Sequence, residues 1–357
     1  METQNLNEEF DILSFDASQL DINTPHQSVS SITSVIYKPR PVDSKSEDGV
    51  YRAQIKVIYN PFNLKQSIIE QQSYMLKDET GYFNVVSSLT NNDTSCPVFK
   101  AWKVCRYSKD PKLQAQQLKV EEGGKGLFDK RFARYVTIQV LDDQNNPDLN
   151  GKYMFWKMPK AVWDVINAKQ SPTNPQKAAI PVMDFLFGRA IDLEVYPGPG
   201  KPGDDRYTRE TKYMCELTEE TVPCVNPDMS SLLTSEQEDI LEQYISDMKD
   251  VWKEKNPETR MELKKKVEAS SNTIALKNFY RDIIEKIKTF CPNLTETLGY
   301  IPWSEETTIR VNNWISKVLK GEDPTIPEVA VIPSTPSASV NSTDADYNTD
   351  TTDDLPF

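Results

Sequence analysis

The sequence predicts a mixed α+β protein in which a β-rich first part is followed by helices and an acidic tail. Two observations carry this prediction. Up to residue 218 the apolar residues alternate over short runs that Pro, Gly and Asn separate, as in strands joined by turns. From residue 234 they recur at helical spacing. Many short strands with one helix and long loops suggest a small barrel such as an OB-fold, although periodicity alone does not separate that barrel from a sandwich.

Composition divides the chain into four segments. Residues 1–50 carry 3 basic and 9 acidic groups among polar residues, which indicates a largely flexible acidic arm. Residues 51–218 form the predicted OB-fold core, and residues 234–321 form a predicted acidic helical module. Residues 322–357 are rich in Pro, Thr, Ser and Asp, with 8 acidic and no basic groups, so we expect a disordered acidic tail.

Each expected element rests on a local pattern. Apolar runs predict strands at residues 34–38, 51–59, 66–76, 82–87, 134–141, 152–157 and 207–217, and a strand pair within residues 182–195 around Gly188. The dipeptide Asn150-Gly151 before an apolar run predicts the turn of a hairpin. Helical spacing predicts a helix at residues 159–168, and residues 111–120 fit a short helix or an excursion. Ser304 and Gly321 are the expected caps of the last helix.

The stretch 128–157 combines cations with aromatic rings. Its basic residues are Lys130, Arg131, Arg134, Lys152 and Lys157, and they alternate with Phe132, Tyr135, Tyr153, Phe155 and Trp156. Cations neutralise phosphates and rings stack on bases, which is the combination that a single-strand binder needs. Strand alternation puts Tyr153 and Phe155 on one face, and we expect that face to meet DNA. The alternative is an ordinary sheet with solvated lysines and core aromatics.

The charge distribution favours a nucleic-acid partner for the centre of the chain. The net charge of −13 on its own argues against one. Residues 95–217, however, carry 20 basic and 15 acidic groups, a net of +5, between acidic flanks. A basic centre with acidic flanks suggests a binding surface with built-in anionic competitors.

Several other function classes are disfavoured. The acidic N-terminus lacks the apolar stretch of a secretory signal, and no run reaches the roughly 18 apolar residues of a membrane span. The five cysteines show no paired short spacing, which indicates thiols in a reducing compartment such as the cytoplasm. The single histidine, His26, excludes histidine triads, and the glycines of residues 123–126 lack the spacing of a phosphate loop. Asp142-Asp143 and Asp204-Asp205 are expected to be solvated turn residues, so we predict no enzyme activity, no cofactor and no membrane partner.

Six stretches of the core carry a family resemblance. They are AQIKVIY (53–59), GYFNVVSSLT (81–90), SCPV (95–98), KRFARYVTIQVLDD (130–143), PDLNGKYMFWKMPKAVWDVI (147–166) and the segment 192–213. In content and order they resemble the replicative single-stranded DNA-binding, or helix-destabilising, proteins of T-even phages. The resemblance implies an OB-fold core that binds single-stranded DNA cooperatively and without sequence choice. It also implies an acidic C-terminal region that contacts replication partners.

Matched by position, the resemblance also implies individual contacts. These are a groove-facing base at Lys56, a basic run at Lys130 and Arg131, an aromatic contact at Tyr135, and a late-strand tyrosine at Tyr207. The neighbouring cation Arg206 is a further candidate DNA contact. The family's zinc motif departs here, because Phe99 stands where the motif has a cysteine. Cys96 and Cys105 alone cannot close a tetrahedral site, so we predict no zinc and expect Phe99 to pack in its place. The family's basic N-terminal cooperativity segment is absent as well.

The last five residues resemble the tip of bacterial single-strand binders. They are Asp353, Asp354, Leu355, Pro356 and Phe357. A ring with a free carboxylate fits a small apolar pocket edged with basic residues, so we expect this tip to bind partner proteins. Together these features predict a phage-type single-stranded DNA-binding protein of the host bacterial cytoplasm. It would coat DNA in replication, recombination and repair, and recruit replication or recombination proteins. The alternative is a non-catalytic interaction or virion-associated scaffold with an OB-like barrel.

Overall fold

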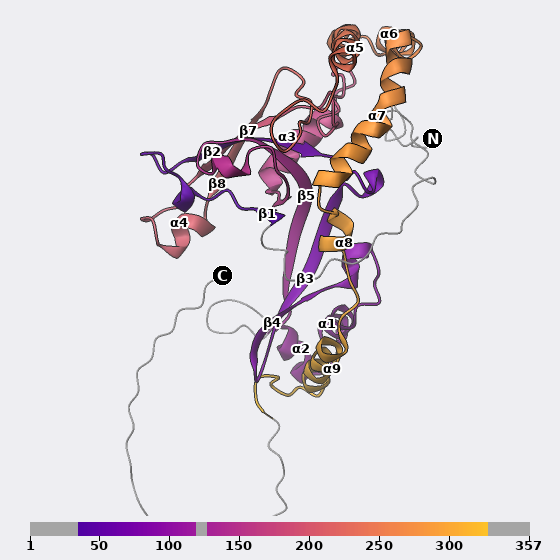
Figure 1. Cartoon of the computed structure of the whole chain (residues 1–357). Coiled ribbons are helices and arrows are strands. Elements are labelled where there is room, and N and C mark those ends of the chain that lie inside the picture. Colours follow the sequence, from indigo (N-terminus) through magenta and orange to yellow (C-terminus); the bar gives the residue numbers. More distant parts are fainter. Residues whose placement is uncertain (1–34, 119–126, 328–357) are drawn as a thin grey trace, which may run out of the picture.

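The computed structural model describes residues 35–118 and 127–327, and in these ranges the chain has the predicted mixed α+β class (Figure 1). The strands are β1 (Ile36–Tyr37), β2 (Tyr51–Ile58), β3 (Ile68–Asp78), β4 (Gly81–Val86), β5 (Asp129–Asp143), β6 (Tyr153–Lys157), β7 (Ile191–Tyr196) and β8 (Lys212–Leu217). They form one sheet with the order β1-β6-β5-β2-β7-β8, and β3 and β4 extend from β5. The pairing path does not return on itself, so the sheet is open and a closed OB-fold barrel is not confirmed.

Strand β5 organises the sheet because it is the longest strand described. Along one edge, its first half pairs with β3 and its second half with β2. Along the other edge it pairs with β6 through the predicted hairpin, in which Gly151 takes a positive φ of 82°. The positive φ favours glycine there. Strand β1 pairs with β6 in parallel, and the remaining pairs are antiparallel.

The described helices are α1 (Pro97–Tyr107), α2 (Pro111–Leu118), α3 (Lys160–Gln170), α4 (Asp205–Arg209), α5 (Ser235–Lys253), α6 (Pro257–Glu268), α7 (Ser271–Phe290), α8 (Leu294–Leu298) and α9 (Glu305–Leu319). Local sequence signals explain where several of them begin. Thr234 and Gln237 form a capping box at α5, and Ser304 caps α9 as predicted. Gly321 follows α9 with a φ of 76°, in agreement with its predicted role at the C-terminus of that helix.

The register of β3 and β5 assigns each side chain to one face of the sheet. Residues directly opposite in an antiparallel pair share a face, and successive residues alternate. We call the face of Lys130, Phe132 and Arg134 the front face, and the face of Arg131 and Tyr135 the back face. This distinction decides which residues can act together.

Helices cover both faces, in four apolar clusters. On the front face, α3 packs over the second half of β5, while α1 and α9 pack over the β3–β4 hairpin. On the back face, α5 and α7 cover Tyr153 of β6, and α8 covers Ile69 and Phe155. The C-terminal helices are therefore spread over both faces instead of forming one bundle. Figure 1 shows α5 and α6 at one end and α1, α2 and α9 at the other, with β3 and β5 between them.

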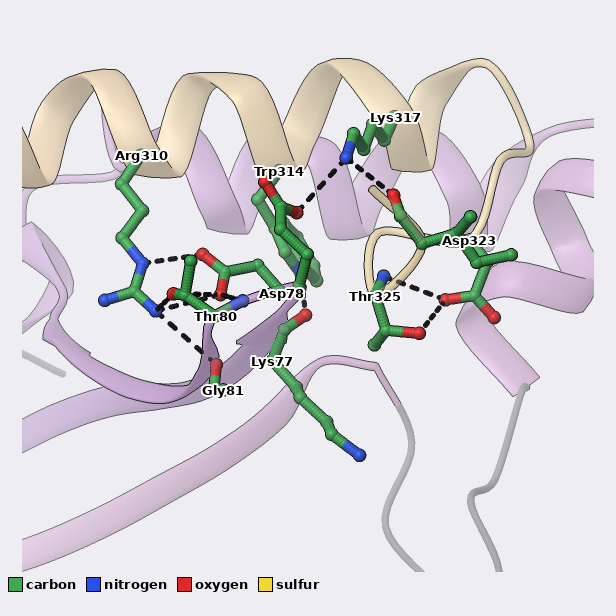
Figure 2. Close-up of polar contacts among 11 residues, drawn as sticks. Lys77, Asp78, Thr80, Gly81, Arg310, Trp314, Lys317, Asp323 and Thr325 are labelled. Carbon is green, nitrogen blue, oxygen red and sulfur yellow. Dashed lines mark hydrogen bonds and ion pairs between the residues drawn. The ribbon is translucent and has the colours of Figure 1, made fainter. Parts of the chain in front are cut away.

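Helix α9 is fastened to the tip of the β3–β4 hairpin by polar contacts (Figure 2). Arg310 donates from Nε and Nη2 to the carboxylate of Asp78 at 2.6 and 2.9 Å. Trp314 Nε1 donates to the carbonyl of Lys77 at 2.9 Å, and Lys317 pairs with Glu79 at 3.1 Å. We call the hairpin with α1, α2 and α9 the hairpin lobe. The hairpin lobe therefore brings together residues that lie far apart in the sequence.

Two expected strands differ from the structure. Residues 182–195 contain β7 alone, because residues 182–187 form buried turns around the Asp184 carboxylate, which accepts from Leu186 N and Phe187 N. Gly188 approaches the carbonyl of Asp184 so closely that a side chain would collide with it. Residues 207–217 contain the end of α4 as well as β8. An apolar run that is buried on all sides does not reveal its backbone conformation.

Candidate nucleic-acid interface

The predicted basic and aromatic run of β5 is divided between the two faces of the sheet. Lys130, Phe132 and Arg134 lie on the front face, and Arg131 and Tyr135 lie on the back face. Phe132 and Tyr135, both predicted to contact DNA, therefore cannot belong to one stacking surface. The reason is the two-residue period of a strand, which places residues three positions apart on opposite faces.

The front face is uncovered where β3 and β5 pass from one cluster to the next. We call this region the bridge surface and define it by Glu70, Gln72, Lys130, Phe132, Arg134 and Trp163. Phe132 is 52% exposed, although it is a large apolar side chain, and Lys130 is exposed beside it. An exposed ring next to a cation in the middle of a sheet is a feature that folding alone does not require.

Arg134 joins the rings of the bridge surface. Its guanidinium carbon lies 6.0 Å from the centroid of Phe132 and 5.1 Å from that of Trp163. Its Nη2 also pairs with Glu70 Oε1 at 2.6 Å. Glu70 is 51% exposed and Arg134 is 17% exposed, so solvent reaches this ion pair mainly from the Glu70 side, and screening there limits its contribution to stability to about 1 kcal/mol. A phosphate can compete with such a partner for the guanidinium.

Gln72 leaves one polar atom of the bridge surface unsatisfied. It lies opposite Phe132 in the register of β3 and β5. Its Oε1 is buried without a hydrogen-bond partner among the described residues. A buried unpaired acceptor is costly, and because this oxygen has no accessible surface it does not itself present an acceptor to a ligand.

Trp163 was not among the predicted contacts, although a sequence signal for it existed. In the predicted helix, the apolar stripe consists of Val162, Val165 and Ile166, and Trp163 lies beside that stripe. In the structure Val162 and Ile166 are fully buried, whereas Trp163 stays partly exposed against Arg134. A tryptophan off the buried stripe of a helix was the available clue.

On the back face, Tyr135 and Arg131 have different surroundings. Tyr135 is half-buried against the cluster of Ile69, Phe155 and α8, and burial raises its pKa. Arg131 is 44% exposed and pairs with Asp129 at 3.2 Å. These two residues therefore do not extend the bridge surface.

Lys56 is not a groove-facing base, and this prediction is wrong. Its side chain is fully buried on the back face, and Nζ donates to the carbonyl of Val222. Burial lowers the pKa of its amine, and the nearest charged groups include Asp184 and Arg189. The residue alternates correctly within β2, but the segment after β8 folds over it.

Three predicted aromatic contacts are also buried. Phe155 is inaccessible beneath α8, and Tyr153 is 5% exposed with its hydroxyl donating to the carbonyl of Val225 at 2.8 Å. Tyr207 is 7% exposed. The expectation that Tyr153 and Phe155 face DNA is wrong because β6 is covered on both faces, so its rings belong to the core.

The remaining predicted residues are exposed or lie outside the described ranges. Lys152 and Lys157 flank β6 and are exposed, and Arg206 pairs with Glu210 at 2.9 Å on the surface of α4. Asp353, Asp354, Leu355, Pro356 and Phe357 lie outside the described residues.

The cysteines of the suspected zinc motif lie in an apolar environment. Cys96 and Cys105 are buried with Val98 in the cluster of the hairpin lobe, and Phe99 packs against that cluster. Within residues 35–118 and 127–327, no three His, Cys, Asp or Glu side chains come together as a metal site would require. In the same ranges, no helix has the length and apolar character to span a membrane.

The comparisons with known proteins supply no function, so any proposed function rests on the geometry of the candidate interface. No protein-family model matches the chain. A search of curated proteins likewise finds no match.

Proposed function

We propose that the protein binds single-stranded DNA without sequence preference. The observation that supports this best is the bridge surface, where Arg134 lies beside the rings of Phe132 and Trp163 on an uncovered stretch of sheet. Bases of any identity stack on such rings, and neighbouring cations hold the phosphates. In this proposal the open sheet binds the strand in place of the expected OB-fold barrel. Base stacking needs one accessible face of a sheet and does not need a closed barrel.

Four residues of the bridge surface have roles in the proposed mechanism. The exposed face of Phe132 accepts a base, and Lys130 and Arg134 approach the flanking phosphates. Glu70 holds the guanidinium in place in the free protein and releases it to the stronger anion. None of these contacts reads the edge of a base, so binding is independent of sequence.

The proposal includes a biological setting. As a phage protein in the host cytoplasm, it would coat exposed DNA during replication, recombination and repair. The acidic residues after Pro327 would compete with DNA for the cationic surface, and the tip at residues 353–357 would recruit partner enzymes.

Titration with oligo-dT tests the proposal directly. We expect Trp163 fluorescence to be quenched on binding, and Phe132→Ala to weaken affinity by about 1–3 kcal/mol, the contribution of one stacked base. Arg134→Ala should weaken affinity and reduce its dependence on salt concentration by roughly 0.7 in the log–log slope.

Two matched controls separate the site from general surface effects. Arg209→Ala removes a surface arginine that is also ion-paired, with Asp205 at 3.3 Å, and Met261→Ala removes an exposed apolar side chain of α6. Both should bind oligo-dT like the unmodified protein. Absence of binding by the unmodified protein at low salt contradicts the proposal and favours the alternative of a non-catalytic scaffold.

A further inference from the structure

The outward side of helix α1 carries cations and rings. Pro97 begins the helix, and Val98, Ala101 and Cys105 form its buried stripe. The residues between them face outward, and the turn after the helix continues the basic character. We define the α1 surface by Phe99, Lys100, Trp102, Lys103, Arg106, Tyr107, Lys109 and Lys112.

The cations of the α1 surface lack acidic partners. Lys100, Lys103, Arg106, Lys109 and Lys112 have no carboxylate within 4.0 Å among the described residues, whereas Arg52, Arg131, Arg134, Arg206, Arg209 and Arg310 each have at least one. The one acid of this stretch, Asp110, accepts from the backbone N–H of Lys112 at 2.9 Å at the start of α2. The charge of Lys100 helps to lower the pKa of Asp93, but the Asp93 carboxylate accepts hydrogen bonds from the backbone N–H and the hydroxyl of Ser95.

Uncompensated positive charge in this place needs an explanation. The whole chain has a net charge of −13, so it contains enough acidic residues to pair with these cations. Five cations over residues 100–112 with one acid produce a local positive potential that attracts polyanions and speeds their association. Helix propensity does not require it, because glutamine or alanine would serve the helix as well.

The rings of the α1 surface point to the kind of polyanion. Phe99 and Trp102 are stacked with centroids 5.7 Å apart and planes 12° apart, and Lys103 lies 4.5 Å from the Phe99 centroid. Tyr107 is 75% exposed at the end of the helix. Unpaired bases offer flat partners for such rings, whereas double-stranded DNA keeps its bases stacked inside. An acidic peptide would use the cations, but its binding does not require the exposed Tyr107 ring.

We propose that the α1 surface is a second contact for single-stranded polynucleotide, separate from the bridge surface and on the hairpin lobe. This inference rests on the proposed single-strand binding. A strand long enough to reach both places would then be held by Phe132 and Arg134 on the sheet and by Tyr107 and its neighbouring cations on α1. The fixed geometry of the lobe supports this, because α9 anchors α1 to the hairpin through the shared apolar cluster.

Binding measurements with two oligonucleotide lengths test the inference in the full chain. The variants are the triple change Lys100→Gln, Lys103→Gln, Arg106→Gln, and separately Tyr107→Ala. The matched control is Lys265→Gln with Lys266→Gln, two exposed lysines of α6 at the far end of the molecule (Figure 1). Affinities for oligo-dT of about 6 and about 30 nucleotides, chosen below and above the usual span of one site, are measured at several salt concentrations.

The expected result depends on length. On the long oligonucleotide the triple variant should lose affinity, with a log–log salt slope lower by about 2, three contacts at roughly 0.7 each. Tyr107→Ala should weaken affinity for the long oligonucleotide about 5- to 140-fold, the equivalent of one stacked base. On the short oligonucleotide both variants should match the unmodified protein and the control, while Phe132→Ala is weak at both lengths.

Three outcomes overturn the inference. The first is a triple variant that equals the control on the long oligonucleotide. The second is equal loss at both lengths, which would make α1 the principal contact. The third is a triple variant that binds more tightly, which would mean that the surface holds an acidic segment of protein. If the unmodified protein binds neither oligonucleotide, the proposed function itself has failed, and that result is distinct from these three.

Discussion

At the scale of single residues, two tyrosines of the same core cluster differ in one hydrogen bond. Tyr280 donates to Asp184 Oδ2 at 2.7 Å, whereas the hydroxyl of Tyr244 is buried without a partner among the described residues. Burial raises the pKa of the Asp184 carboxyl, and its other donors are the backbone N–H groups of Leu186 and Phe187. The two tyrosines therefore form a matched pair for measuring what this bond contributes.

We expect Tyr280→Phe to lower the free energy of unfolding by about 1.5–3 kcal/mol, because a buried carboxylate loses a donor. Tyr244→Phe removes a buried hydroxyl without a partner and with it that group's desolvation cost, so the free energy of unfolding should stay the same or rise. Urea denaturation of both variants provides the measurement. Equal losses in the two variants would show that the bond to Asp184 contributes nothing to stability beyond packing of the ring.

The sequence predicted that cations and rings form the candidate interface, but it did not predict which of these residues are exposed. Lys130, Phe132 and Arg134 were recognised from the alternation of cations and rings in one strand. Tyr153 and Phe155 follow the same pattern and are nevertheless buried, because α7 and α8 pack on β6 from more than 100 residues away in sequence. Local patterns show which residues share a face, and long-range packing decides whether that face is covered.

At the scale of elements, α9 depends on an ion pair with the hairpin. Asp78 is buried and Arg310 is partly exposed, and the guanidinium holds the pKa of the Asp78 carboxyl well below its usual range. A lowered folded-state pKa stabilises the fold above the unfolded-state pKa of about 3.9. That stabilisation is lost as the pH falls from there toward the lower folded-state value.

We therefore expect the hairpin lobe to lose stability in acid and to keep it at neutral pH. Asp78→Asn should lower stability by about 1–2 kcal/mol at pH 7, reduced from the buried-pair value because Arg310 is partly solvated. It should also flatten the loss of stability below about pH 4. Hydrogen exchange of β4 and α9 across this pH range reports the change.

A surface ion pair supplies the control for this prediction. Asp164 pairs with Lys160 at 2.6 Å, but both side chains are more than half exposed, at 54% and 82%. Asp164→Asn should change neither stability nor its pH dependence measurably. If Asp78→Asn also changes neither quantity, the packing of α9 on the hairpin does not depend on the Asp78–Arg310 ion pair.

Elements with local signals were predictable, and elements defined by distant contacts were not. The hairpin of β5 and β6, helix α3 and the caps of α9 follow from Asn150-Gly151, apolar spacing, Ser304 and Gly321. The strand pair expected in residues 182–195 failed because the apolar run is buried in turns, which composition alone does not distinguish from a strand.

At the scale of the whole molecule, the sequence predicted strands followed by helices, but it missed helices α1 and α4 and did not predict how the elements assemble. The helices after residue 234 were expected to form one module. They instead cover the back face, cross the edge of the sheet where Trp303 Nε1 donates to the carbonyl of Val86 at 2.7 Å, and reach the front of the hairpin lobe. Among the described residues, this path leaves the front face of β3 and β5 uncovered between the two ends, and so it creates the bridge surface.

The point at which the described chain ends follows from the same path. The described chain ends at Pro327, shortly after α9, on the lobe that carries the α1 surface. Gln116 Nε2 donates to the carbonyl of Glu322 at 3.0 Å, and Lys317 Nζ donates to that of Ile326 at 2.9 Å. A truncation after Pro327 therefore keeps the contacts of α9 and removes only the residues that follow.

We expect deletion of residues 328–357 to strengthen binding to oligo-dT at low salt. The deletion removes six acidic and no basic residues, which changes the net charge from −13 to −7. The affinities of the full and truncated chains should converge as salt rises, because screening shortens the reach of surface charges to about 8 Å at physiological ionic strength. Removal of Phe357 alone should leave DNA affinity unchanged and abolish any capture of partner proteins through the tip. If the full and truncated chains bind equally at every salt concentration, the acidic segment does not compete for the cationic surfaces.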